Sequence, residues 1–167
     1  MIHDLDLILA LTKGEPVKVQ ANGVPVITNY VDIANARIEF SDGMVANVTA
    51  SRVSLKKMRK LRLFGQSEYI VLDLDEGECE IIGGTINNDP IPEDADSLGS
   101  MEVDSKKLNL FHRSLSADHE DALRLELSSF RDSIVNHTLP VVTGEDGLRA
   151  LQLAEKIIEI MQDSRKN

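Results

Sequence analysis

The strongest constraint on the fold is a change in the spacing of apolar residues along the chain. Between residues 34 and 53, apolar and polar residues alternate on both sides of Ser41-Asp42-Gly43. A period of two is typical of half-buried strands, and Asp-Gly between two such runs is typical of a β-hairpin. We therefore predict strands over 34–40 and 44–53 that pair antiparallel.

Further strands are expected toward the middle of the chain. Residues 68–74 and 78–82 predict a second hairpin, which turns through Asp75-Glu76-Gly77. Residues 58–64 and 106–112 each predict one more strand.

Two segments do not fit this pattern. Asn22-Gly23 resembles a hairpin turn, but Pro25 cannot donate to a ladder directly after it, so this position stays open. Residues 83–104 are rich in Gly, Asn, Pro and acidic side chains. We expect an irregular surface excursion or a partner contact there, in preference to a catalytic lid.

Helical spacing is found at both ends of the chain. Residues 4–12 predict a short helix, and residues 119–136 a second one. Thr143, with Asp146 three residues later, predicts the N-cap of a third helix. The third helix carries two apolar stripes, of which one is Leu148, Leu151, Ala154, Ile158 and Met161 and the other is Leu153, Ile157 and Ile160. Two stripes are too many for a surface helix, so we expect burial on two sides or a covering element outside these residues.

Strands followed by helices predict one α+β domain over residues 1–167. Its sheet should be mixed, mostly antiparallel and open-faced, with the helices packed on one face. The open face carries polar residues and could meet water or another subunit, and we predict a homodimer through it. The polar residues of the open face are Asn35, Arg37, Asn47, Thr49 and Ser51.

The charge balance excludes several classes of partner. Acidic residues number 28 against 18 Lys and Arg, which gives a formal charge of −10. Such a chain repels phosphate backbones and anionic membranes, so we expect no nucleic-acid or membrane partner. No apolar run is long enough to span a membrane, and residues 1–6 lack a basic signal-peptide start. The single cysteine, Cys79, cannot form an internal disulfide, so we expect a reducing, cytoplasmic setting.

Few residues have a pattern that indicates chemistry. The sequence has no G-x-G-x-x-G run, no phosphate-binding loop and no histidine spacing typical of a metal site. His3 could transfer a proton near neutral pH, although a lone histidine is usually a surface residue. A basic cluster is either a solvated strand face or a contact for an anionic or hydroxyl-rich ligand. Its members are Arg52, Lys56, Lys57, Arg59, Lys60 and Arg62.

Both ends of the chain resemble a known family. Residues 1–9 resemble the H-x-x-D-x-x-x-x-L run that opens the C-terminal domain of Gfo/Idh/MocA oxidoreductases, the glucose–fructose oxidoreductase and inositol dehydrogenase family. Residues 125–155, with Glu126-Leu127, Phe130, Pro140 and Thr143-Gly144-Glu145-Asp146-Gly147, resemble its closing signature. Residues 32–40 and 46–52 fit its central strands.

The resemblance implies that two domains together carry out the function. A Rossmann domain, missing from these residues, binds NAD or NADP, and this domain supplies the substrate side and often the dimer contact. The resemblance places His3 in the proton-transfer role, with Asp6 and Arg52 beside a small sugar-like or cyclitol substrate. Alone, the chain is expected to bind no cofactor and to be inactive. It would then be a fragment, the product of a split gene or a truncated product.

A rival interpretation is a standalone, non-catalytic ligand-binding or scaffold protein that keeps the fold. It would need polar residues where the nucleotide domain once packed. Leu153, Ile157 and Ile160 look like an interface for that domain and so favour the first interpretation.

Overall fold

The structure is a computed structural model that describes residues 1–55, 58–86, 89–117 and 121–163. The predicted α+β class is confirmed. The strands form two sheets, β1-β2-β3 within residues 16–51 and β4-β5-β6-β8-β7 within residues 60–116, where the sequence predicted a single mixed sheet. All strand pairings between described residues are antiparallel. The chain divides into two compact units, Met1–Leu55 with Glu126–Asn167, and Lys56–Leu125.

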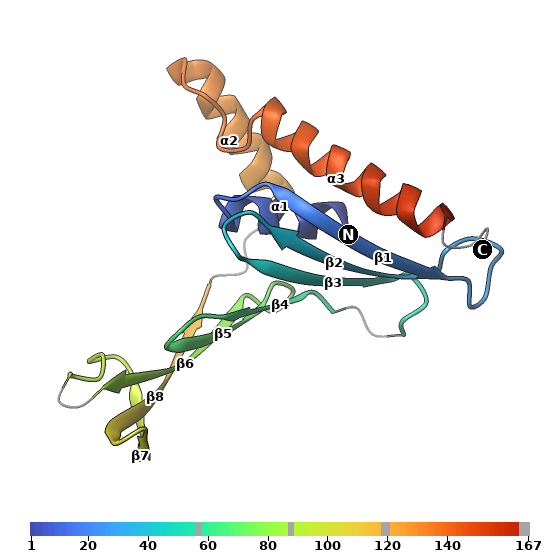
Figure 1. Cartoon of the computed structure of the whole chain (residues 1–167). Coiled ribbons are helices and arrows are strands. Elements are labelled where there is room, and N and C mark those ends of the chain that lie inside the picture. Colours follow the sequence, from blue (N-terminus) through green and yellow to red (C-terminus); the bar gives the residue numbers. More distant parts are fainter. Residues whose placement is uncertain (56–57, 87–88, 118–120, 164–167) are drawn as a thin grey trace. The chain divides into compact units, whose positions relative to one another are not determined.

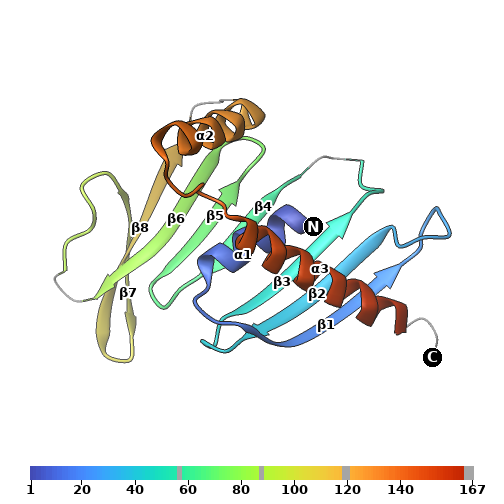
Figure 2. The same ribbon diagram turned by 90° about the horizontal axis from the view of Figure 1, so that it is seen from above.

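The first unit is a three-stranded sheet with two helices on one face. The strands are β1 (Pro16–Val24), β2 (Ile33–Phe40) and β3 (Val45–Ser51). Helices α1 (Ile2–Leu11) and α3 (Gly144–Asp163) lie across this sheet, as Figures 1 and 2 show. The predicted β2–β3 hairpin is confirmed, and its turn places Gly43 at a φ of 89°. This left-handed conformation favours glycine because a Cβ atom would clash with the backbone.

The core of this unit lies between the sheet and the two helices. Alternate residues of β2 and β3 point into it, and Ile38 and Leu5 are fully buried. The buried apolar residues are Leu5, Ile8, Leu9, Ala21, Ala36, Ile38, Phe40, Val48, Ala150, Leu153, Ile157 and Met161.

The two apolar stripes of α3 have different environments from those expected. Leu153 and Ile157 are buried against the unit's own core, so the expectation that they form an uncovered interface is wrong. The stripe that remains exposed contains Leu148, Leu151 and Ile158. The division into stripes was wrong for Met161, which the sequence placed on the first stripe and which is buried in the core with Leu153 and Ile157. Spacing could not tell which residues the sheet covers, because both stripes have helical periodicity.

The second unit contains the five-stranded sheet. Its strands are β4 (Lys60–Phe64), β5 (Glu68–Asp73), β6 (Glu78–Ile86), β7 (Asp96–Val103) and β8 (Lys106–Ser116). The predicted β5–β6 hairpin is confirmed, with Gly77 at a φ of 69° in its turn.

The expectation that residues 83–104 are irregular is wrong for most of that segment. β6 continues to Ile86, and β7 pairs with β8. Gly83 lies in β6 opposite Phe111, and a Cβ atom on Gly83 would come within 2.3 Å of the Phe111 ring. The glycines therefore make room inside a sheet, a use that composition does not separate from that of a loop. Residues 87–88 lie outside the described residues.

Residues 22–23 and the second helix were also subjects of prediction. Asn22-Gly23 lies inside β1, paired with Asn35 and Ala34, so the chain reverses later, at residues 25–32. Helix α2 covers Ala122–Asn136, whereas residues 119–120 of the predicted helix lie outside the described residues. Its apolar stripe, which contains Leu127, Phe130 and Ile134, is exposed. No helix among the described residues is both long and apolar enough to cross a membrane.

Candidate functional site

The most highly organised polar site is the connection between β1 and β2. The Asp32 side chain is fully buried at the end of this loop, directly before β2. Its Oδ2 accepts hydrogen bonds from the backbone N–H groups of Val26, Ile27 and Thr28, each at 2.8 Å. The Asp32 N–H also donates to the carbonyl of Val24 at 2.9 Å. One carboxylate thus fixes the backbone of the whole loop.

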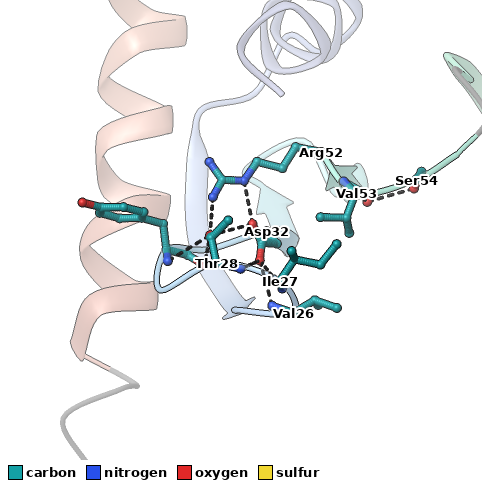
Figure 3. Close-up of polar contacts among 9 residues, drawn as sticks. Val26, Ile27, Thr28, Asp32, Arg52, Val53 and Ser54 are labelled. Carbon is teal, nitrogen blue, oxygen red and sulfur yellow. Dashed lines mark hydrogen bonds and ion pairs between the residues drawn. The ribbon is translucent and has the colours of Figure 1, made fainter.

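The other oxygen of Asp32 joins this loop to β3. Asp32 Oδ1 accepts hydrogen bonds from Thr28 Oγ1 at 2.9 Å and from Arg52 Nε at 2.7 Å. Arg52 Nη2 donates to Thr28 Oγ1 at 2.5 Å, which closes the triangle drawn in Figure 3. The backbone N–H of Arg52 also donates to the Asp32 carbonyl at 3.0 Å. We call Asp32, Thr28 and Arg52 the Asp32 network.

The charge of Asp32 is strongly stabilised. Backbone hydrogen bonds from Thr28 and Ile27 lower the pKa of its carboxyl far below the ordinary value, although burial acts in the opposite direction. Val26 and Arg52 lower it further. A carboxylate with this many donors stays ionised throughout the physiological range.

Arg52, which the sequence placed beside the substrate, is anchored but not buried. Its side chain is 53% exposed, whereas the Asp32 carboxylate it pairs with is 0% exposed. The guanidinium therefore has one edge fixed by the protein and another edge open to solvent.

His3 and Asp6 lie together on α1. Leu5, Ile8 and Leu9 anchor the inner face of this helix, whereas His3 is exposed and Asp6 is half-buried on the outer face. Residues three apart are neighbours on a helix surface. No hydrogen bond or ion pair joins Arg52 to either of them; the substrate role of all three residues stays a prediction.

The basic cluster predicted from the sequence is divided between the two units. Lys60 pairs with Asp73 at 2.9 Å, and this hydrogen bond raises the pKa of Lys60. Lys60 lies on β4 of the second unit, whereas Arg52 belongs to the first. Lys56 and Lys57 lie outside the described residues. Among the residues that are described, no group of three His, Cys, Asp or Glu could hold a metal ion.

The polar face of the three-stranded sheet forms a shallow groove of about 360 Å³. Two cross-strand rows line it, Gln20–Arg37–Asn47 and Asn22–Asn35–Thr49. Arg37 Nη1 donates to Asn47 Oδ1 at 3.2 Å, and Thr49 Oγ1 donates to Asn35 Oδ1 at 2.8 Å. This face is mostly uncharged, although the whole chain carries a formal charge of −10.

Arg52 was predicted from the sequence, whereas the residues that hold it were not. Asp32 and Thr28 were not singled out, although an Asp that directly precedes a strand and follows a Pro- and Asn-containing loop is a recognisable signal for a side chain that caps backbone N–H groups. The long-range partner, Arg52, is 20 residues away and follows only from the strand register.

Comparison with known families matches the first part of the chain to an oxidoreductase family. Residues 1–71 match the family model described as the GFO/IDH/MocA C-terminal domain. The family resemblance inferred from the sequence is thus confirmed for residues 1–71, which match the C-terminal domain of that family.

The particular relatives are sugar dehydrogenases. UDP-N-acetylglucosamine 3-dehydrogenase of Acidithiobacillus ferrooxidans is 34% identical over 160 residues, which are 94% of this chain and 45% of that protein. Its solved structure superposes with a TM-score of 0.79 at 29% identity, over 98% of this chain and 46% of that one. Levoglucosan dehydrogenase in complex with NADH and levoglucosan has a TM-score of 0.73 at 14% identity, over 98% and 47%, and shows the shared fold alone. The chain spans about half the length of the relatives it matches.

Proposed function

We propose that this chain is the substrate-side half of an NAD(P)-dependent dehydrogenase that acts on a sugar hydroxyl, and that its substrate is a nucleotide-linked sugar. The observation that carries the proposal is the 34% identity to a UDP-N-acetylglucosamine 3-dehydrogenase, which extends over 94% of the chain. Without its nucleotide-binding half, we expect the chain to be inactive. The cytoplasmic location stays a prediction from the sequence.

His3 is our candidate for the proton transfer. It is exposed on the outer face of α1, and the buried residues Leu5 and Ile8 hold the helix that carries it. An imidazole nitrogen can act as a general base, so His3 can accept the proton of a substrate hydroxyl as that carbon becomes a carbonyl carbon. Asp6 lies one turn further along the same face and would contact the substrate or orient His3.

The described residues do not fit the nicotinamide cofactor. A dinucleotide-binding fold is built from parallel strands joined by helices, with a glycine-rich turn at the phosphates. Every strand pairing between described residues is antiparallel. We therefore assign NAD or NADP to a part of the protein outside these 167 residues.

The exposed helix stripes suit that missing half. Leu127, Phe130 and Ile134 of α2 are each more than half exposed, and Leu148 and Ile158 of α3 are close to half exposed. Apolar side chains in such number on adjacent helices are uncommon on a free surface. We propose that the nucleotide-binding half packs on them.

A chimera tests the proposed function. This chain would replace the C-terminal half of the Acidithiobacillus ferrooxidans enzyme, and the formation of NADH or NADPH would be followed with UDP-N-acetylglucosamine. We expect turnover, and a loss of about 10²–10⁴-fold with His3→Asn because a general base contributes that much. A folded chimera that binds both ligands and turns over equally well with His3→Asn contradicts the assigned role.

We also propose a homodimer through the polar face of the three-stranded sheet. Each amide on this face offers both a donor and an acceptor, so a row of Asn and Gln can pair with its own copy across a two-fold axis. The face is mostly uncharged, so two acidic chains can approach through it. Light scattering should give twice the 18.5 kDa chain mass. The double substitution Asn35→Asp and Asn47→Asp should give monomers, and a wild-type monomer at micromolar concentration would contradict the proposal.

Leu153 and Ile157 no longer distinguish a standalone scaffold from a dehydrogenase half. Leu153 and Ile157 are buried in this chain's own core and say nothing about a missing domain. The exposed stripe with Leu148 and Ile158 now makes that argument, and again it favours a partner domain.

A further inference from the structure

We propose that Arg52, held side-on by Asp32 and Thr28, is a binding group for a diphosphate. This inference deepens the proposed function and rests on it, because it identifies the diphosphate as that of the nucleotide-linked sugar. Asp32 and Thr28 are then positioning residues, which act through Arg52 and do not touch the ligand themselves.

The geometry of the guanidinium is the first argument. An arginine has five N–H donors in one plane, arranged along two edges. Nε and Nη2 of Arg52 donate to Asp32 and Thr28 at 2.7 and 2.5 Å, and these bonds use one edge. The other edge, two N–H groups on Nη1 and one on Nη2, makes no hydrogen bond to another described residue. An open edge of this kind matches two oxygens of a phosphate in bidentate fashion.

The charge balance at the site is the second argument. Asp32 is the charged partner of Arg52, so the two side chains together are formally neutral. Its Oδ2, however, is already surrounded by three backbone N–H groups, which stabilise the carboxylate independently of Arg52. The side chain of Arg52 is 53% exposed and keeps a cationic edge in solvent. The flanking segments 25–31 and 51–55 contain no acidic residue that would repel an anion.

The rigidity of the site is the third argument. Thr28 Oγ1 contacts both Asp32 and Arg52, and it also accepts a hydrogen bond from the N–H of Tyr30 at 3.1 Å. Figure 3 shows the side chains of the Asp32 network converging from the loop and from the end of β3. A long arginine side chain loses considerable conformational entropy when it binds a ligand. Here much of that loss has already occurred on folding, so the open edge is preorganised.

The test uses the full 167-residue chain labelled with ¹⁵N. Inorganic pyrophosphate, UDP, UDP-N-acetylglucosamine and NADH are titrated separately, and the resonances of Arg52 Nε–H and of the backbone N–H groups of residues 26–30 are followed. We expect saturable shifts with pyrophosphate and UDP, and at least tenfold tighter binding of UDP-N-acetylglucosamine than of NADH. The absence of any shift with 10 mM pyrophosphate overturns the inference.

Variants separate positioning from a merely structural role. Arg52→Lys keeps the charge but cannot span Asp32 and a ligand, so the pyrophosphate affinity should fall about tenfold or more. Thr28→Val removes the hydroxyl that orients Nη2, and a fall of a few-fold is expected. Arg149→Lys is the matched control, since Arg149 also forms an ion pair in the same unit, with Glu15 at 3.0 Å, and should leave binding unchanged. Equal affinity in folded wild-type, Arg52→Lys and Thr28→Val chains means that the network is structural only.

The outcomes also separate this inference from the proposed function. If UDP-N-acetylglucosamine binds but Arg52→Lys has no effect, the inference fails and the proposed function stands. If pyrophosphate binds through Arg52 but NADH binds more tightly than the nucleotide-linked sugar, the diphosphate belongs to the cofactor. In that case the assignment to the substrate is wrong, and so is the assignment of the cofactor site to another part of the protein.

Discussion

Replacing Ile157 by alanine should destabilise the protein far more than the same change at its neighbour Ile158. Ile157 is 1% exposed and packs in the core between α3 and the three-stranded sheet. The substitution removes three buried carbon atoms and leaves a cavity, which costs about 2–5 kcal/mol at such sites. For a chain of this length, about 3 kcal/mol corresponds to a fall in Tm of roughly 6–12 °C.

Ile158 is the matched control. It is 47% exposed, so alanine removes less buried surface there. Alanine also favours the helix over a β-branched residue by a few tenths of a kcal/mol. We therefore expect Ile158→Ala to change the free energy of unfolding by no more than about 0.5 kcal/mol, as surface substitutions usually do.

The measurement is urea and thermal unfolding, followed by circular dichroism at 222 nm, of the wild type and the two variants. The sequence alone places Ile158 on the first stripe and Ile157 on the second, which is expected to face another domain. Equal loss of stability in the two variants, or a larger loss with Ile158→Ala, would refute the packing of α3 described above.

Three further predictions concern single side chains. Gly83→Ala places a Cβ atom 2.3 Å from the Phe111 ring and should cost about 1–3 kcal/mol in the free energy of unfolding, whereas Gly147→Ala, with nothing within 4 Å, should be neutral or stabilising. Thr143→Ala removes the oxygen that accepts the Asp146 N–H at 3.2 Å and should cost about 1 kcal/mol of stability, which urea unfolding can measure. Asp32 has a lowered pKa, so it contributes stability above the ordinary value of 3.8 and loses it as the pH falls below that value. The difference in urea midpoint between wild type and Asp32→Asn should therefore be constant from pH 7 to 5 and narrow below pH 4, and an unchanged difference at pH 3 would contradict this.

Local sequence signals predicted the elements that local chemistry determines. The Asp42-Gly43 turn, the turn at Gly77 and the Thr143 cap depend on residues within a few positions of one another, and all three are confirmed. The role of Gly83 could not be predicted in this way, since it depends on Phe111 on the neighbouring strand. The sequence does not distinguish a glycine that forms a turn from a glycine that makes room for an aromatic ring on the next strand.

The same limit applies to the site. Side-chain chemistry singled out His3 and Arg52, and the family resemblance added Asp6 and the proton-transfer role of His3. The partners of Arg52 required the register of β2 and β3, which brings residues 20 positions apart into contact. Such contacts are long-range, so periodicity within either strand does not predict them.

The two sheets differ in how many apolar side chains they bury within their own unit. The three-stranded sheet has α1 and α3 on one face and a full core between them. In the five-stranded unit, Phe111 is the only buried apolar residue among those described. The cross-strand row Leu63, Ile70 and Ile81 is only half-buried, although its members share one face. A sheet with an apolar face needs a second layer to exclude water from it. The half-buried apolar row is therefore the part of the five-stranded sheet that a second layer would cover.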